Sequence, residues 1–181
     1  MSNLPTVLGL DISLNGTGAV ILENDELLYH DRFEPENTGI ERLIEIEEYV
    51  TDLIETNLLD LVVIEGYAFA RSNQAHQMGE IGGVIRRRLH KLRVPWIEVS
   101  PNQVKKFATG KGNCKKDLIL MNVYKRWKVE FQSSDEADAF VLAKIGTILK
   151  GYTESLNQKQ LEVIKTLKKG GLNGQAGYDF R

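Results

Sequence analysis

Four acidic residues stand where an α/β chain could bring their side chains together. Asp11 follows the apolar stretch "VLGL", and Glu65 ends the apolar stretch "LVVI". Because sites in open α/β sheets form at the carboxyl ends of parallel strands, neighbouring strands would carry both carboxylates to one edge of the sheet. Asp135 and Asp138 lie three residues apart at the start of a predicted helix, so they project from one of its faces. The alternative for this pair is that it complements the positive end of the helix dipole, which explains Asp135 better than Asp138.

A cluster of four carboxylates favours metal-dependent chemistry. Converging carboxylates repel one another, and burial makes their ionisation more costly, so a divalent cation would stabilise them. Magnesium prefers oxygen ligands and bridges to phosphate oxygens. Two such ions about 3.5 to 4 Å apart can activate a water and stabilise the leaving oxygen in phosphodiester cleavage. We therefore expect two Mg2+ ions, for which Mn2+ could substitute.

Charge is distributed unevenly along the chain. Residues 1–65 contain fifteen acidic side chains against two arginines, whereas residues 84–128 contain thirteen basic side chains against two acidic ones. This asymmetry predicts a polyanionic partner for the basic segment. The alternative is that the acidic and basic segments form two solvated faces that pair with each other.

Apolar periodicity predicts the elements that must position the acids. Three successive strands separated by turn residues form a β-meander, and two later apolar runs are typical of buried parallel strands. A capping box of Ser133 and Glu136 marks the start of a long helix. These elements predict a mixed α/β sheet flanked by helices. The strands are expected over residues 5–12, 16–23, 26–33, 59–66 and 94–100, and the helices over 38–56, 73–92, 101–108, 115–127 and 133–149.

Composition bounds the class of protein. The 181 residues, 42% hydrophobic and 27% charged, suit one ordinary globular domain, which we expect over residues 1–151. Residues 152–181 are predicted to form a C-terminal helical extension and a flexible Gly-rich tail. A single cysteine, Cys114, excludes an internal disulfide framework and a multi-cysteine zinc site. With no apolar run of about 18 residues and no signal segment, we expect a cytoplasmic protein without a membrane span.

The ordered set of acids resembles the RuvC-type Holliday junction resolvases of the RNase H-like superfamily, with a phage-type member as one alternative. That family has an Asp in its first strand, a Glu after its fourth and a D-x-x-D pair at a late helix start. The segment "VSPNQVKKFATGKGNCKK" is similar to the family's "QVK…G-x-G…K" segment, and "GEIGGVI" resembles the start of its central dimer helix. The resemblance covers roughly residues 5 to 150. It implies an RNase H-like five-stranded mixed sheet and a homodimer that cleaves four-way DNA junctions, leaving 3′-hydroxyl and 5′-phosphate ends.

The resemblance also implies residue roles. It matches Asp11, Glu65, Asp135 and Asp138 to the catalytic magnesium ligands. The family often has Pro-Gly after its first aspartate, whereas this chain has Ile-Ser, which leaves the acid intact and changes only the loop. Two lysines match family residues that contact DNA near the scissile phosphate and are counted with the catalytic set: Lys105 and Lys116.

Further residues are predicted to contact branched DNA. The loop after Glu65 matches a DNA-facing loop in which the family carries an inserting aromatic, although Tyr67 and Phe69 could equally be core residues. The lysines around "TGKGN" flank glycines whose backbone amides could approach phosphate. A solvated lysine-rich loop is the alternative. The predicted DNA-binding residues are Tyr67, Phe69, Arg71, Lys105, Lys106, Lys111, Lys115 and Lys116.

Three other functions remain open from the sequence. An RNase H-like core also occurs in ATPases, in which "DISLNGTG" would be a phosphate loop, but that reading needs a second half for which 181 residues leave no room. A non-catalytic nucleic-acid binder is disfavoured because four uncompensated acids would weaken DNA binding. A nuclease that acts on flaps or RNA–DNA hybrids would use the same metal chemistry.

Overall fold

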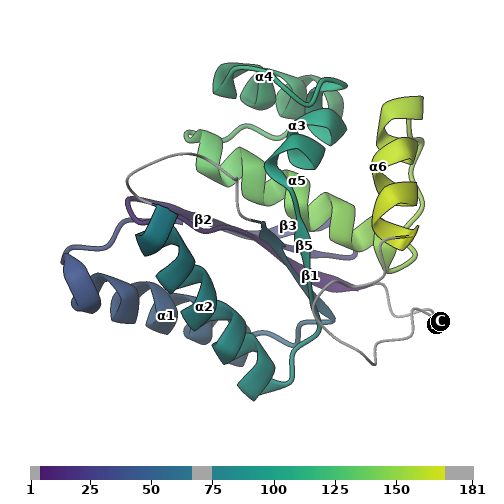
Figure 1. The fold of residues 1–181 in the computed structure, drawn as a ribbon. Coiled ribbons are helices and arrows are strands. Elements are labelled where there is room, and N and C mark those ends of the chain that lie inside the picture. The colour runs from purple at the N-terminus through teal and green to yellow at the C-terminus, as the bar shows by residue number, and fades with distance from the viewer. Residues whose placement is uncertain (1–4, 67–74, 170–181) are drawn as a thin grey trace.

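A five-stranded mixed sheet organises the chain (Figure 1). The computed structural model describes residues 5–66 and 75–169. The strand order is β3-β2-β1-β4-β5, in which the first three strands are antiparallel and β4 and β5 run parallel to β1. The predicted meander and mixed RNase H-like sheet are confirmed. The strands are β1 (Thr6–Asp11), β2 (Thr17–Glu23), β3 (Glu26–Phe33), β4 (Leu61–Glu65) and β5 (Trp96–Val99).

Helices cover both faces of the sheet. Figure 1 shows α1 and α2 on one face and α3 to α6 on the other. Each face has its own hydrophobic cluster. Successive residues of β1 point to opposite faces, so Val7 packs in one cluster and Leu8 in the other. Burial on both faces explains why β1, β2 and β4 are nearly continuous apolar runs. The helices are α1 (Gly39–Thr56), α2 (Ala75–Leu92), α3 (Pro101–Thr109), α4 (Lys116–Trp127), α5 (Ser134–Leu149) and α6 (Gln158–Lys169).

Helix α5 lies directly on the central strands. Every residue from Glu136 to Leu149 is buried. Glycines in the sheet make this close approach possible: a Cβ at Gly9 would stand 2.0 Å from the Ala139 carbonyl oxygen, and a Cβ at Gly18 would stand 2.1 Å from the Asp135 carbonyl oxygen. Any larger residue at either position would push the helix away. The glycines therefore fix the distance between the start of α5 and strands β1 and β2.

The C-terminal helix packs on the same core. Val163 and Ile164 of α6 are buried in the cluster that α5 fills. Gln160, fully buried, donates a hydrogen bond from Nε2 to the Phe107 carbonyl oxygen at 3.2 Å. The predicted extension thus contributes a helix that covers α3, and the predicted flexible tail, residues 170–181, lies outside the described residues.

A buried ion-pair network anchors the segment that leads to α6. Lys144 is 2% exposed, and its Nζ lies 2.6 Å from Asp25 Oδ2 and 2.8 Å from Glu154 Oε2. Asp25 belongs to the β2–β3 turn, where positive φ angles of 53° at Asn24 and 67° at Asp25 are typical of a type I′ hairpin. The network ties the hairpin turn, α5 and the chain after α5 together.

Candidate metal centre

Three of the four predicted acids converge. Asp11 and Glu65 end the neighbouring parallel strands β1 and β4, whose register pairs Leu10 with Ile64. Asp138 projects from the second turn of α5, which lies on β1. One carboxylate oxygen from each of these three residues lies within 4.8 Å of the others. The prediction that adjacent strands carry Asp11 and Glu65 to one edge of the sheet agrees with this geometry.

The donor set suits a hard divalent cation. All three ligands are carboxylate oxygens, which Mg2+ and Mn2+ accept, while soft metals prefer sulfur or imidazole. Asp138 is only 6% exposed, and Asp11 and Glu65 are half-buried. Three acids so close together at low exposure repel one another unless a cation or protons neutralise them. The residues present therefore fit a metal ion.

Asp135 is not a member of this cluster. Its Oδ2 accepts a charge-assisted hydrogen bond from Arg32 Nε at 2.8 Å. Arg32 also forms an ion pair with Glu34. Sequence reasoning missed Arg32 because 103 residues separate it from Asp135, and no spacing rule connects an edge strand with a helix so distant in the chain.

His30, two residues before Arg32 on β3, forms a hydrogen bond with the same turn of α5. Its Nδ1 lies 2.7 Å from Glu136 Oε1. Glu136 completes the predicted capping box, in which its backbone amide donates to Ser133 Oγ at 3.1 Å and its Oε2 accepts from the Ser133 amide at 3.1 Å. Burial alone would raise the pKa of the Glu136 carboxyl, but the hydrogen bonds from His30 and Ser133 outweigh burial and lower that pKa. The first turn of α5 is thus held by its own cap and by the edge strand.

The predicted DNA-contacting lysines lie along α3 and the loop that follows it. Helix α3 begins with a capping box of Ser100 and Gln103, an S-x-x-Q signature that sequence analysis overlooked. Lys105 is partly exposed on α3, Lys111 and Lys115 are exposed in the loop, and Lys116 is the first residue of α4.

Lys106 has a partner within the chain. Its Nζ lies 2.8 Å from Glu162 Oε2 on α6. An exposed pair of this kind contributes little, so Glu162 offsets the charge of Lys106 only in part. The remaining predicted DNA contacts, Tyr67, Phe69 and Arg71, lie outside the described residues.

Part of the charge asymmetry is satisfied within the chain. Arg88 Nε of α2 lies 2.9 Å from Glu47 Oε1 of α1, and Arg86 Nε lies 2.7 Å from Glu98 Oε1 of β5. The alternative, in which the acidic and basic segments pair with each other, thus holds for Arg88, whereas Arg86 pairs with an acid of the basic segment itself. It does not extend to the exposed lysines between α3 and α4.

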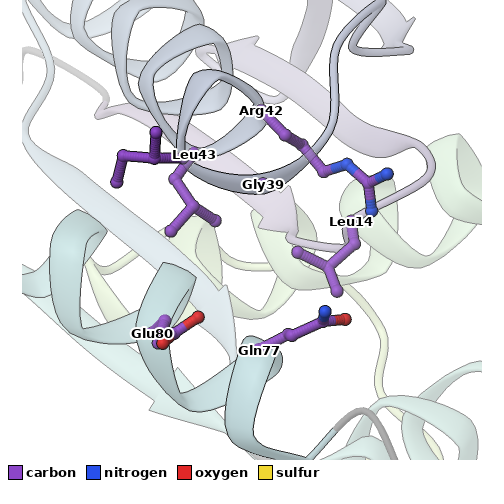
Figure 2. Close-up of a pocket in the computed structure, with 7 residues that line it drawn as sticks. Leu14, Gly39, Arg42, Leu43, Gln77 and Glu80 are labelled. Atoms are coloured by element: carbon purple, nitrogen blue, oxygen red, sulfur yellow. The ribbon is translucent and has the colours of Figure 1, made fainter.

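An open pocket of about 230 Å³ lies between α1, α2 and the loop after β1. In Figure 2, Gln77 and Glu80 of α2 face Leu14 and the start of α1 across it. None of the clustered acids lines this pocket, so it is separate from the candidate metal centre. Its lining residues are Leu14, Gly39, Ile40, Arg42, Leu43, Gln77 and Glu80.

Known proteins are similar to this chain in sequence and in fold. The family model described as "Crossover junction endodeoxyribonuclease RuvC" matches residues 7–145. The RuvC protein of Synechococcus sp. (strain WH7803) is 28% identical over 151 residues, covering 77% of this chain and 96% of the relative. The RuvC protein of Prochlorococcus marinus (strain MIT 9313) is 30% identical over 148 residues, with the same coverage of 77% and 96%. Both relatives are cyanobacterial and give no support to the phage-type alternative.

The fold comparison agrees with the sequence comparison. The solved structure titled "T. thermophilus RuvC in complex with Holliday junction substrate" superposes with a TM-score of 0.65 at 23% identity, covering 77% of this chain and 90% of that chain. The family match, residues 7–145, covers the acid cluster and all of the sheet except Thr6, and it ends within α5, before α6. The chain belongs to the RuvC family of crossover junction endodeoxyribonucleases.

Proposed function

We propose that this protein is a magnesium-dependent, structure-selective endonuclease that resolves Holliday junctions and acts on other branched DNA. The observation that carries the proposal is the convergence of Asp11, Glu65 and Asp138 on a RuvC fold. All-oxygen ligands favour Mg2+, and Mn2+ could take its place. The exposed lysines beside α3 supply the positive charge that a DNA backbone requires. The single cysteine fits action in the reducing cytoplasm.

The chain would use its residues in three roles. Asp11, Glu65 and Asp138 would hold one divalent ion, and Asp135 would complete the site for a second. Bound ions of this kind supply an activated water and stabilise the leaving oxygen. Lys105 and Lys116 would stabilise the charge that develops on the scissile phosphate. In-line attack by water would leave 3′-hydroxyl and 5′-phosphate ends.

A homodimer with α2 at its two-fold axis would cut both strands. Gly79 and Gly83 are exposed on α2, four residues apart, and a Cβ at either position would meet no described atom within 4 Å. Glycine in a helix interior is less favourable than alanine by about 1 kcal/mol, so two exposed glycines on one face suit a second helix packed closely there. Gly82, which precedes Gly83 in the stretch "GEIGGVI", is buried and does not belong to this face. A two-fold dimer would match the near symmetry of a four-way junction.

Cleavage of synthetic DNA tests this function. The protein is incubated with a four-way junction, a flap, a plain duplex and an RNA–DNA hybrid in Mg2+, and the products are mapped at nucleotide resolution. We expect paired nicks in the four-way junction and little cutting of the duplex. Preferential cutting of the flap or the hybrid would support the alternative nuclease readings. ATP hydrolysis without DNA cleavage would support the ATPase reading instead.

A further inference from the structure

Arg32, Gly18 and Asp11 form one row across three strands. The sheet register pairs Asp11 with Gly18 and Gly18 with Arg32. Two strand spacings, about 10 Å in all, therefore separate the backbones of Asp11 and Arg32. The first turn of α5 rests on Gly18, between them. Asp138 reaches the acid cluster that contains Asp11, and Asp135 reaches Arg32.

The guanidinium of Arg32 is held in place from several sides. A Cβ at Gly16 would stand 2.4 Å from Arg32 Nη2, so the side chain lies against the backbone of the β1–β2 loop. Glu34 and Asp135 bind it as ion-pair partners, and it remains 31% exposed. An arginine keeps its charge at any pH the protein meets, so only a competing interaction can release Asp135.

Arg32 lowers the affinity of the site for a second cation in two ways. The ion pair competes with a second metal ion for the Asp135 carboxylate, because Arg32 binds its Oδ2. The guanidinium also adds a positive charge on the side of the acid cluster where Asp135 lies, and it repels a cation bound there. Both effects weaken cation binding in the absence of DNA. A bound phosphodiester would offset both, because its negative charge attracts the guanidinium and the cation alike.

We propose that Arg32 restrains the loading of the second divalent ion, so that the two-ion site is completed when the substrate phosphate arrives. Arg32 acts through Asp135 and is a positioning residue. The inference rests on the proposed function, since it concerns the regulation of the same site. Its consequence is a nuclease that binds the second ion more weakly away from DNA than beside a substrate phosphate.

Titration with Mn2+ in the absence of DNA tests the inference. Free Mn2+ is counted by electron paramagnetic resonance for the wild type, Arg32→Gln, Arg32→Lys and Arg88→Gln. Arg88 is the matched control because its Nε binds Glu47 at 2.9 Å on the opposite face of the sheet. We expect Arg32→Gln to bind the second Mn2+ roughly threefold to tenfold more tightly, because it removes one partly exposed ion pair and one repelling charge. Arg32→Lys, which keeps the charge, should stay closer to the wild type, and Arg88→Gln should not change.

Adding Asp135→Asn to Arg32→Gln should abolish the gain, because the second ion loses its ligand. A gain that persists in this double variant, or a second-ion affinity that Arg32→Gln leaves unchanged or weakens, would overturn the inference. A purely structural role for Arg32 would lower the melting temperature and leave the second-ion affinity unchanged.

The wild-type protein supplies an independent readout. Its Arg32 Nε–H resonance should move during the second step of a Mg2+ titration, as Asp135 exchanges partners. A resonance that stays fixed at saturating Mg2+ would contradict the proposal even if the variants fail to fold. None of these measurements uses DNA, so failure to cut junctions would count against the proposed function and leave this result standing.

Discussion

A carboxylate in an apolar strand lowers stability unless a cation or hydrogen bonds compensate its charge. Asp11 ends β1, whose preceding residues from Val7 to Leu10 are all buried. Its nearest acidic neighbours, Glu65 and Asp138, increase the repulsion that burial already creates. A bound divalent cation would turn this repulsion into attraction, which is the role proposed for Asp11.

Neutralising Asp11 should separate chemistry from binding. We expect Asp11→Asn to fold normally and to lose at least about a hundredfold in single-turnover junction cleavage, since it removes a direct ligand and even outer-shell changes at metal sites lower activity about 10- to 100-fold. Junction affinity should be unchanged or higher, because one negative charge near the phosphate is gone. The control is Asp117→Asn on α4, which is exposed and distant in sequence from the acids. Wild-type cleavage by Asp11→Asn would exclude the metal-ligand role.

Lysines that contact phosphate should contribute to the salt dependence of junction binding. Each phosphate contact contributes about 0.9 to the slope of log affinity against log salt concentration. Lys105→Ala and Lys116→Ala should each flatten that slope by roughly one unit on a four-way junction and slow cleavage at saturating protein. Lys159→Ala is the control, because Lys159 lies on α6 and pairs with Glu162 at 3.4 Å. Unchanged slopes and rates for Lys105 and Lys116 would leave the basic segment as a solvated face.

At the scale of elements, the position of α5 decides the geometry of the acids. Gly18→Ala would place a Cβ 2.1 Å from the Asp135 carbonyl oxygen, so the first turn of α5 must shift. We expect a loss of about 1 to 3 kcal/mol in the free energy of unfolding, measured in urea, and weaker Mn2+ binding. Gly112→Ala is the control, since its Cβ would make ordinary contact at 3.4 Å with the Asn102 carbonyl oxygen. Equal effects of the two substitutions would show that close packing at Gly18 does not position the acids.

Sequence patterns predicted the elements better than the contacts between them. Apolar runs fix strands and helices locally, and the Ser133 capping box located the start of α5 because both partners lie within one turn. The Arg32–Asp135 pair escaped prediction because it depends on β3 being an edge strand beside α5. The sequence did not show which glycine of "GEIGGVI" faces outward. Gly82 is buried and Gly83 is exposed, because burial on an amphipathic helix depends on the partner as well as on the period.

At the scale of the whole molecule, paired cleavage requires two copies of the acid cluster in fixed relation. A single chain supplies one such cluster among its described residues. Two nicks placed symmetrically across a junction therefore call for a two-fold assembly. Helix α2 begins ten residues after Glu65, so in a dimer joined along α2 a short stretch of chain would connect each acid cluster to the interface.

Substitution at Gly83 tests that interface. Both Gly83→Ala and Gly83→Leu should stabilise an isolated α2 by up to about 1 kcal/mol through helix propensity, so they differ chiefly in bulk. We expect Gly83→Leu to weaken self-association at least about tenfold in sedimentation velocity and to convert paired nicks into independent ones, because a leucine side chain holds two helices apart. Gly83→Ala should remain a dimer with coupled nicks, since a methyl group still permits close approach. A wild type that sediments as a monomer at micromolar concentration, also when bound to a junction, would exclude the homodimer, and wild-type association of Gly83→Leu would move the interface away from this face of α2.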